Sequence, residues 1–137
     1  MEEMGIAAQQ DIGRASFQTK IFDSDGFISI IDHLTKNLKR WVFEKVDTPM
    51  MTGPGSSYIV HEPLGVALVM GTWNFPTFTS LNPAAEAIAA GNCVLLKPSE
   101  MAPAQSKVIC KIFAEYLDPR CYCVIEGGPA VAEALLL

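Results

Sequence analysis

The sequence lacks several features that would assign it to a familiar class of protein. It has 10 Lys and Arg against 15 Asp and Glu, a formal net charge of −5. It therefore has no basic excess of the kind that nucleic-acid surfaces and polybasic membrane patches need. No apolar run approaches the roughly 18 residues of a membrane span. The start, Met1-Glu2-Glu3-Met4, is neither basic nor followed by the apolar segment of a secretory signal. We expect a cytoplasmic chain with no nucleic-acid partner.

Cysteine and histidine are too few and too poorly spaced to indicate a disulfide framework or a metal site. The four cysteines are Cys93, Cys110, Cys121 and Cys123. Cys121 and Cys123 are separated by one residue, whereas redox and zinc pairs usually have two between them. With only His33 and His61 to add, a four-ligand zinc site is a weak alternative, and we predict no metal.

What the sequence does have is enough apolar material for a packed core. Half of its 137 residues are hydrophobic and 18% are charged, which excludes a disordered chain and fits one domain. Apolar residues recur at steps of three and four from Phe27 to Val42, which predicts an amphipathic helix. Asp23, Ser24 and Asp25 are candidate caps for its start. A break follows from Asp47 to Ser57, rich in Gly, Pro and Ser.

From Gly65 onward, short apolar runs alternate with helical patterns. We predict strands at 66–70, 93–96 and 122–125, and helices that end at Gly91-Asn92, span Val108 to Leu117 and open at Pro129. The first strand reads as buried on both faces. The predicted fold class is α/β: N-terminal helices followed by a βαβαβα half of a Rossmann-like parallel sheet. Three strands make only half of a doubly wound sheet, so the topology is incomplete.

Polar clusters follow the first two predicted strands, where ligands bind in open α/β sheets. They are Thr72-Trp73-Asn74 and Lys97-Pro98-Ser99-Glu100, with Asn74 and Lys97 23 residues apart. In dinucleotide folds a ribose-binding residue follows the first turn by about 20 residues. Lys97 donates and Glu100 accepts hydrogen bonds, which suits vicinal ribose hydroxyls. However, the Gly-x-Gly-x-x-Gly fingerprint is absent, and a surface ion pair at a helix start stays an alternative.

The motifs in this region resemble the NAD(P)-dependent aldehyde dehydrogenase superfamily. They are Glu-Pro-Leu-Gly at 62–65, Trp-Asn-Phe-Pro at 73–76, Lys-Pro-Ser-Glu at 97–100 and Tyr-Leu-Asp-Pro at 116–119. The first and last of these look most like the class 3 branch, which includes fatty aldehyde dehydrogenase. The resemblance is strongest over residues 58–128, and the family's sheet also lacks the usual glycine fingerprint after its first strand.

The resemblance implies three segments and a set of partners. Residues 1–57 would form an N-terminal helical region and loop, residues 58–64 a candidate oligomerisation strand, and residues 65–137 the first half of the NAD(P)-binding domain. The cofactor would be NAD or NADP and the substrate an aldehyde. The full-length parent would be a homo-oligomer, expected to be a dimer. Some family members carry C-terminal anchors, so membrane association is expected only of a full-length parent.

The resemblance also implies roles for five residues. Asn74 matches the asparagine whose amide helps to form the oxyanion hole, although it could instead cap the helix near residue 76. Lys97 and Glu100 match the pair that contacts the adenosine ribose. Thr72 and Trp73 match walls of the cofactor cleft, with a core position as the alternative for Trp73.

The resemblance leaves the nucleophile outside this sequence. The family's catalytic cysteine, its glutamate base and its glycine-bearing loop all lie beyond the point that matches Leu137. Cys93 and Cys123 fall inside predicted buried strands, where cysteine is an inert hydrophobe. We therefore expect an N-terminal portion of an aldehyde-oxidising enzyme that is inactive alone. One alternative is a non-catalytic module that pairs with a full-length subunit through residues 58–60 or through its exposed sheet edge. The other is a self-contained nucleotide-binding domain.

Overall fold

The N-terminal part of the chain is helical, as expected. The structure is a computed structural model that describes residues 2–137. Its first elements are α1 (Glu2–Ile12), α2 (Ser16–Thr19), the π-helical turn η1 (Lys20–Asp25) and α3 (Gly26–Val42). The predicted amphipathic helix is thus confirmed as α3. The predicted caps are wrong: α2, η1 and α3 run on without a break, Asp25 makes no side-chain cap bond, and Asp23 and Ser24 are buried.

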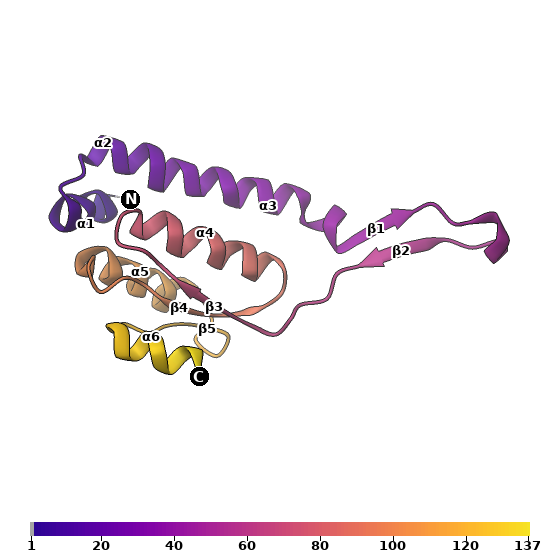
Figure 1. Ribbon diagram of the computed structural model, residues 1–137. Helices are drawn as coiled ribbons and strands as arrows, with labels where there is room; N and C mark the ends of the chain where they lie inside the picture. The colour runs from indigo at the N-terminus through magenta and orange to yellow at the C-terminus, as the bar shows by residue number, and fades with distance from the viewer. Residues whose placement is uncertain (1) are drawn as a thin grey trace.

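After α3 the chain forms a hairpin that projects away from the rest of the molecule (Figure 1). Strand β1 (Phe43–Val46) pairs antiparallel with β2 (Ser57–Val60), and the short 3₁₀ helix η2 (Met50–Thr52) lies at the tip. The β-prone run at 58–60 is therefore a strand, but it ends at Val60 and does not extend to residue 64. Sequence reasoning missed β1, because its Phe-Glu-Lys-Val sequence follows the helix directly and carries no turn signal before it.

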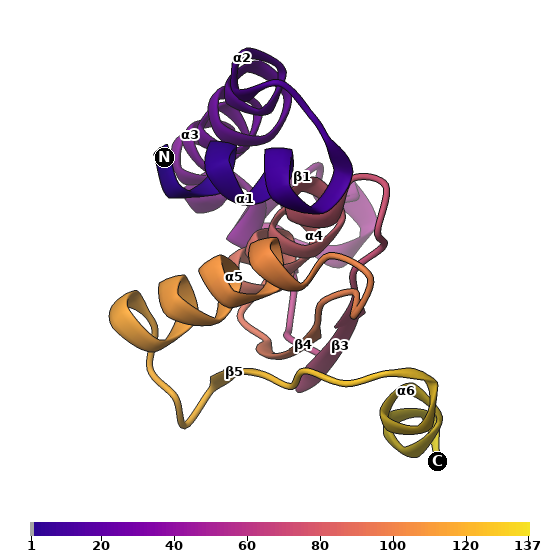
Figure 2. The same cartoon turned by 90° about the vertical axis from the view of Figure 1, so that its left-hand side faces the viewer.

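The second half of the chain is the predicted βαβαβα unit. Its elements are β3 (Val66–Met70), α4 (Pro76–Ala89), β4 (Cys93–Lys97), α5 (Pro103–Tyr116), β5 (Tyr122–Val124) and α6 (Pro129–Leu136). The three strands are parallel in the order β3-β4-β5. Helices α4 and α5 cover one face of this sheet, and α6 lies on the other side (Figure 2). The predicted α/β fold class is confirmed.

The core lies between this sheet and the helices on its covered face. Leu96 and Val94 of the central strand are 0% and 1% exposed, and they pack with Ile109 and Phe113 of α5. The expectation that the first strand is buried on both faces is wrong. Val66 is 72% exposed. β3 is an edge strand, and one of its faces points away from the layer formed by α4 and α5.

Helix α4 ends at the predicted glycine-asparagine cap. Gly91 has φ +85, which favours glycine, and the Asn92 N–H donates to the Ala87 carbonyl at 3.0 Å. The Asn92 side-chain oxygen accepts a 3.0 Å bond from the Gly65 N–H. The cap therefore also holds the start of β3 beside the start of β4.

Helix α5 receives its cap from a distant part of the chain. The Asp11 carboxylate at the end of α1 accepts the backbone N–H groups of Ala104 and Gln105 at 3.0 and 2.8 Å. A carboxylate at a helix N-terminus satisfies free donors and complements the helix dipole. This contact fixes α1 against the sheet domain. Within residues 2–137, no helix combines the length and the apolar character that crossing a bilayer requires.

Candidate functional site at the carboxyl ends of the strands

The two polar clusters meet where β3 and β4 end. Met70 and Lys97 are register partners, and the Gly71 N–H donates to the Lys97 carbonyl at 2.9 Å. The loop from Gly71 to Asn74 therefore starts directly beside the turn from Lys97 to Glu100. Gly71 also lets the start of this loop pack closely against α4, because a Cβ there would overlap the hydroxyl of Ser80.

Lys97 is a buried lysine. Its side chain is 6% exposed, and its Nζ lies 2.9 Å from the Pro98 carbonyl and 3.0 Å from the Glu100 carboxylate. An ammonium has three donors, so these contacts leave one donor for a ligand. The pair is not the exposed ion pair at a helix start that the sequence alone allowed, because Lys97 is buried and α5 begins only at Pro103.

Glu100 is the outward-facing member of the pair. Hydrogen bonds from its own backbone N–H and from the Lys97 ammonium lower the pKa of its carboxyl. At neutral pH the site therefore presents an ionised carboxylate next to a buried ammonium. That combination offers both acceptors and a donor to a diol.

Asn74 lies in an exposed loop with its side-chain carbonyl already occupied. The Thr72 hydroxyl donates to Asn74 Oδ1 at 2.7 Å. The amide NH₂ therefore stays available as a donor. The alternative that Asn74 caps α4 is wrong, because the residue that precedes the helix is Phe75 and no side-chain hydrogen bond caps this helix end.

Trp73 is 55% exposed, so the core alternative for this residue is also wrong. An exposed indole next to polar groups offers a flat apolar surface against which a planar ligand can pack. Thr72 and Trp73 belong to the same loop as Asn74, which follows the carboxyl end of β3.

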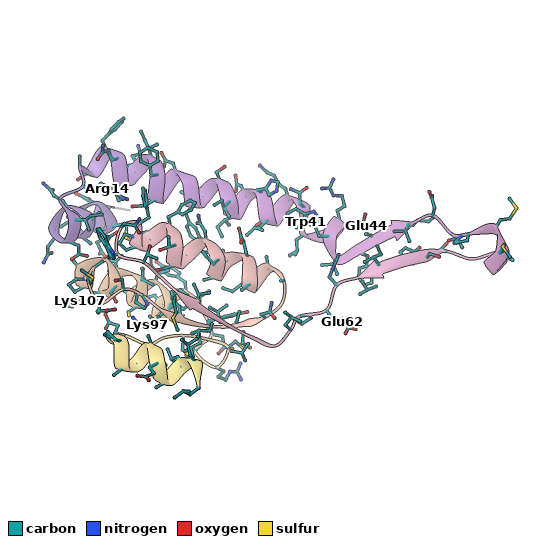
Figure 3. All side chains as sticks on the ribbon, viewed as in Figure 1. Arg14, Trp41, Glu44, Glu62, Lys97 and Lys107 are labelled. Atoms are coloured by element: carbon teal, nitrogen blue, oxygen red, sulfur yellow. The ribbon has the colours of Figure 1, made fainter. Side chains whose placement is uncertain are left out.

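Arg14 also contributes to this site, and sequence reasoning missed it. Its guanidinium donates to the backbone carbonyl of Asn74 at 2.8 Å and pairs with Asp23 at 3.0 Å. It also lies 4.5 Å from the centre of the Phe75 ring. Arg14 and Lys97 lie at the end of the molecule opposite the hairpin (Figure 3). Asn74 and Arg14 are 60 residues apart in sequence, and no local pattern could have paired them.

Asp23 is the buried partner in this arrangement. Its side chain is 0% exposed and Oδ1 has no partner among the described residues. Burial raises the pKa of Asp23, while the charge and hydrogen bond of Arg14 lower it. The charge of Arg14 therefore offsets part of the cost of burying the Asp23 carboxylate.

Two of the four cysteines, Cys110 and Cys121, are in surroundings that do not activate a thiolate. Burial, and then the nearby Glu126 carboxylate, raise the pKa of Cys110, and a hydrogen bond with Cys93 raises the pKa of Cys121. A nucleophilic cysteine needs the opposite shift. The prediction that Cys123 is buried is wrong, because it is exposed on the face of the sheet away from α4 and α5.

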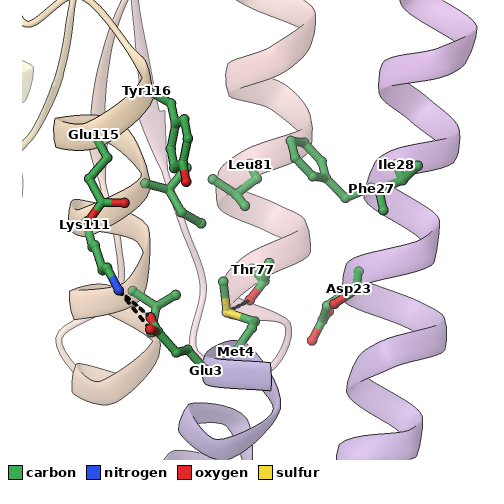
Figure 4. Close-up of a pocket in the computed structure, with 13 residues that line it drawn as sticks. Glu3, Met4, Asp23, Phe27, Ile28, Thr77, Leu81, Lys111, Glu115 and Tyr116 are labelled. Atoms are coloured by element: carbon green, nitrogen blue, oxygen red, sulfur yellow. Dashed lines mark hydrogen bonds and ion pairs between the residues drawn. The ribbon is translucent and has the colours of Figure 1, made fainter. Parts of the chain in front are cut away.

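A hollow of about 410 Å³ lies elsewhere, among α1, α3, α4 and α5 (Figure 4). Its rim carries the Lys111–Glu3 ion pair at 2.8 Å, and Thr77 donates to the sulfur of Met4 at 3.1 Å. Neither polar cluster of the strand ends lines it. We attribute it to packing between the helices.

Comparison with known proteins identifies the family. The aldehyde dehydrogenase family profile matches residues 1–137. The chain is 41% identical to aldehyde dehydrogenase family 3 member H1 of Arabidopsis thaliana over 135 residues, which covers 98% of this chain and 28% of that protein. It is 45% identical over 131 residues to the chloroplastic family 3 member I1 of the same plant, with 95% and 24% covered.

A solved structure agrees with these relatives. The substrate-bound state of Staphylococcus aureus AldH has a TM-score of 0.93 at 32% identity, covering 98% of this chain and 30% of that one. The chain thus spans less than a third of the length of these relatives. It belongs to the aldehyde dehydrogenase family and resembles members of family 3.

Proposed function

We propose that this chain supplies the nucleotide-binding edge of an NAD(P)-dependent aldehyde dehydrogenase. The observation that carries the proposal is the strand register, which brings the loop from Gly71 to Asn74 beside the buried ammonium of Lys97. Ligands of open α/β sheets bind at this edge. Family membership supports a dinucleotide as the ligand and an aldehyde as the substrate of the complete enzyme.

Lys97 and Glu100 would hold the adenosine ribose. The free donor of Lys97 and the ionised carboxylate of Glu100 match the acceptors and donors of vicinal hydroxyls. Glu100 would also disfavour a 2′-phosphate through repulsion between like charges. We therefore expect NAD⁺ to bind more tightly than NADP⁺. Thr72 and the exposed indole of Trp73 would form the wall beside the nucleotide.

Asn74 would act on the substrate rather than on the cofactor. Thr72 holds its amide oxygen, which would leave the NH₂ group as a fixed donor for an oxyanion. Loss of one such donor typically lowers a rate about 100- to 1000-fold. When bound, the dinucleotide supplies the hydride acceptor, which no side chain can replace.

Nucleotide binding by the chain tests this proposal directly. We expect saturable NAD⁺ binding by calorimetry or by quenching of tryptophan fluorescence, with weaker binding of NADP⁺. Lys97→Met should weaken NAD⁺ binding about 10- to 150-fold, because a charge-assisted hydrogen bond contributes about 1.5 to 3 kcal/mol. Glu100→Gln should narrow the difference between NAD⁺ and NADP⁺.

Lys36→Met is the matched control, since Lys36 is an exposed lysine on α3 that pairs with Asp32 and belongs to neither polar cluster. Circular dichroism shows whether each variant is folded. A folded wild-type chain that does not bind NAD⁺, or equal losses in both lysine variants, would contradict the proposal.

The chain by itself should not turn over an aldehyde. The two thiols with shifted pKa values, Cys110 and Cys121, are shifted toward the protonated form. Incubation with NAD⁺ and a medium-chain aldehyde should therefore give no increase in NADH absorbance. Sustained turnover would show that one of the cysteines is a nucleophile after all.

An alternative function is supported by the hairpin. Its exposed apolar side chains include Phe43, Tyr58 and Val60 at 62%, 54% and 51%. A non-catalytic chain could use this strand pair to join a full-length subunit by strand addition. Co-purification with a full-length subunit, abolished by truncating the hairpin, would favour this alternative over nucleotide binding.

A further inference from the structure

Three of the four cysteines share the sheet face that lies away from α4 and α5. Along β4, Val94 and Leu96 are buried against the helices, so Cys93 alternates to the other face. Along β5, Tyr122 and Val124 alternate with the exposed Cys123, and Cys121 precedes them in the same phase as Cys123. Cys110 belongs instead to α5.

The strand register places Cys93 beside Cys121. Val94 and Tyr122 are partners in the parallel pair of β4 and β5, so the residues that precede them are neighbours across the strands. The Val94 N–H donates to the Cys121 carbonyl at 2.9 Å, which fixes the two backbones next to each other. Adjacent strands are about 4.8 Å apart, within the range of about 4.4 to 6.8 Å between Cα atoms that a disulfide spans.

The side chains are close as well as the backbones. Interaction with the Cys93 side chain is the main cause that raises the pKa of Cys121, and both thiols are half-buried and therefore within reach of a small reagent. Cys123 is less well placed: its register partner is Leu95, and two residues along a strand separate it from Cys121 by about 6.6 Å. The geometry thus selects Cys93 and Cys121 as a pair.

We propose that Cys93 and Cys121 form a dithiol modification site that a low-molecular-weight disulfide closes to a cross-strand disulfide. One thiolate attacks the reagent disulfide, forms a mixed disulfide and releases one reagent thiolate. The second cysteine, as its thiolate, attacks the protein sulfur, forms the Cys93–Cys121 bond and releases the second reagent thiolate. The protein loses two electrons and two protons, and the reagent disulfide is reduced to two thiols.

This bond joins the start of β4 to the start of β5 and so closes a loop of the chain that contains α5. A bond that closes a loop constrains the unfolded chain, so the oxidised protein should melt at a higher temperature than the reduced one. Because the thiolate is the attacking species, the neighbouring Cys93 side chain, which raises the pKa of Cys121, should make closure slow at neutral pH and faster as the pH rises.

The test uses the full 137-residue chain and oxidised glutathione. After incubation and blocking of free thiols, we expect an intact mass that has lost two hydrogens and a peptide map that links Cys93 to Cys121. Cys93→Ser and Cys121→Ser should each stop the closure and leave glutathione attached to the remaining cysteine. Cys110→Ser and Cys123→Ser are the matched controls and should close like the wild type.

Three results would overturn the proposal: glutathione adducts without an internal bond, a bond between Cys121 and Cys123, or a bond only between two chains. The peptide map of the wild-type chain distinguishes them even if a serine variant fails to fold. None of these outcomes depends on nucleotide binding.

Discussion

Replacing Arg14 with methionine is expected to lower the free energy of unfolding by about 3 to 5 kcal/mol, the usual cost of leaving a buried charge without its partner. Asp23 is 0% exposed, and Arg14 is its ion-pair partner at 3.0 Å. The substitution also removes the donor to the Asn74 carbonyl, so the loop that carries Asn74 loses its anchor to the N-terminal helices. Urea unfolding followed by circular dichroism measures the loss.

The pH dependence of this loss distinguishes an unpaired charge from simple loss of packing. Burial raises the pKa of Asp23, so this group stabilises the fold when protonated, and its contribution is lost as the pH rises through its folded pKa. Removing Arg14 raises that pKa further. The difference in the free energy of unfolding between wild type and Arg14→Met should therefore be large at neutral pH. It should become smaller as the pH falls toward about 4.

Two further variants serve as controls. Arg120→Met removes an ion pair with Asp118 in which the arginine is 86% exposed, and it should change the stability far less, because water screens an exposed ion pair. Arg14→Met combined with Asp23→Asn removes both charges and should recover part of the stability. A difference that stays constant across the pH range would contradict the role of Arg14 as the compensating charge.

Replacing Leu96 with alanine is expected to lower the free energy of unfolding by about 2 to 5 kcal/mol, because the truncation leaves a cavity in a packed core. Leu96 is 0% exposed at the centre of β4, where it packs with Ile109 and Phe113. It directly precedes Lys97. Denaturant titration measures the effect, and a variant that still folds should also bind NAD⁺ less tightly.

Val66→Ala is the matched control for this truncation. Val66 lies in the same sheet but is 72% exposed, so its truncation removes little buried area. If the Leu96 and Val66 variants lost similar stability, the core would not lie on the α4 and α5 side of the sheet.

The hydrophobic patterns in the sequence were sufficient to predict most of the helices and strands. The period of three to four residues between Phe27 and Val42 predicted α3, because one apolar stripe must face a neighbour. Gly91 and Asn92 marked the end of α4, since few other residues adopt φ +85. β1 was missed because it follows α3 directly, with no turn signal between the helix and the strand.

For the candidate site, the sequence determined the residue types and the order of the two clusters. Polar residues after buried strands predicted that Thr72 to Asn74 and Lys97 to Glu100 would share one edge, because parallel strands end on the same side of a sheet. Only the tertiary structure decided the environment of each residue. It buried Lys97, left Trp73 exposed and brought Arg14 to the Asn74 carbonyl.

The physical reason is the range of the interactions involved. Periodicity, caps and turns depend on residues a few positions apart, and the sequence shows these directly. Burial, ion pairs and strand register depend on segments that meet only after folding. The neighbours Arg14 and Asn74, and equally Cys93 and Cys121, are brought together by the packing of α1 and by the β4–β5 register, and neither pair carries a local signal.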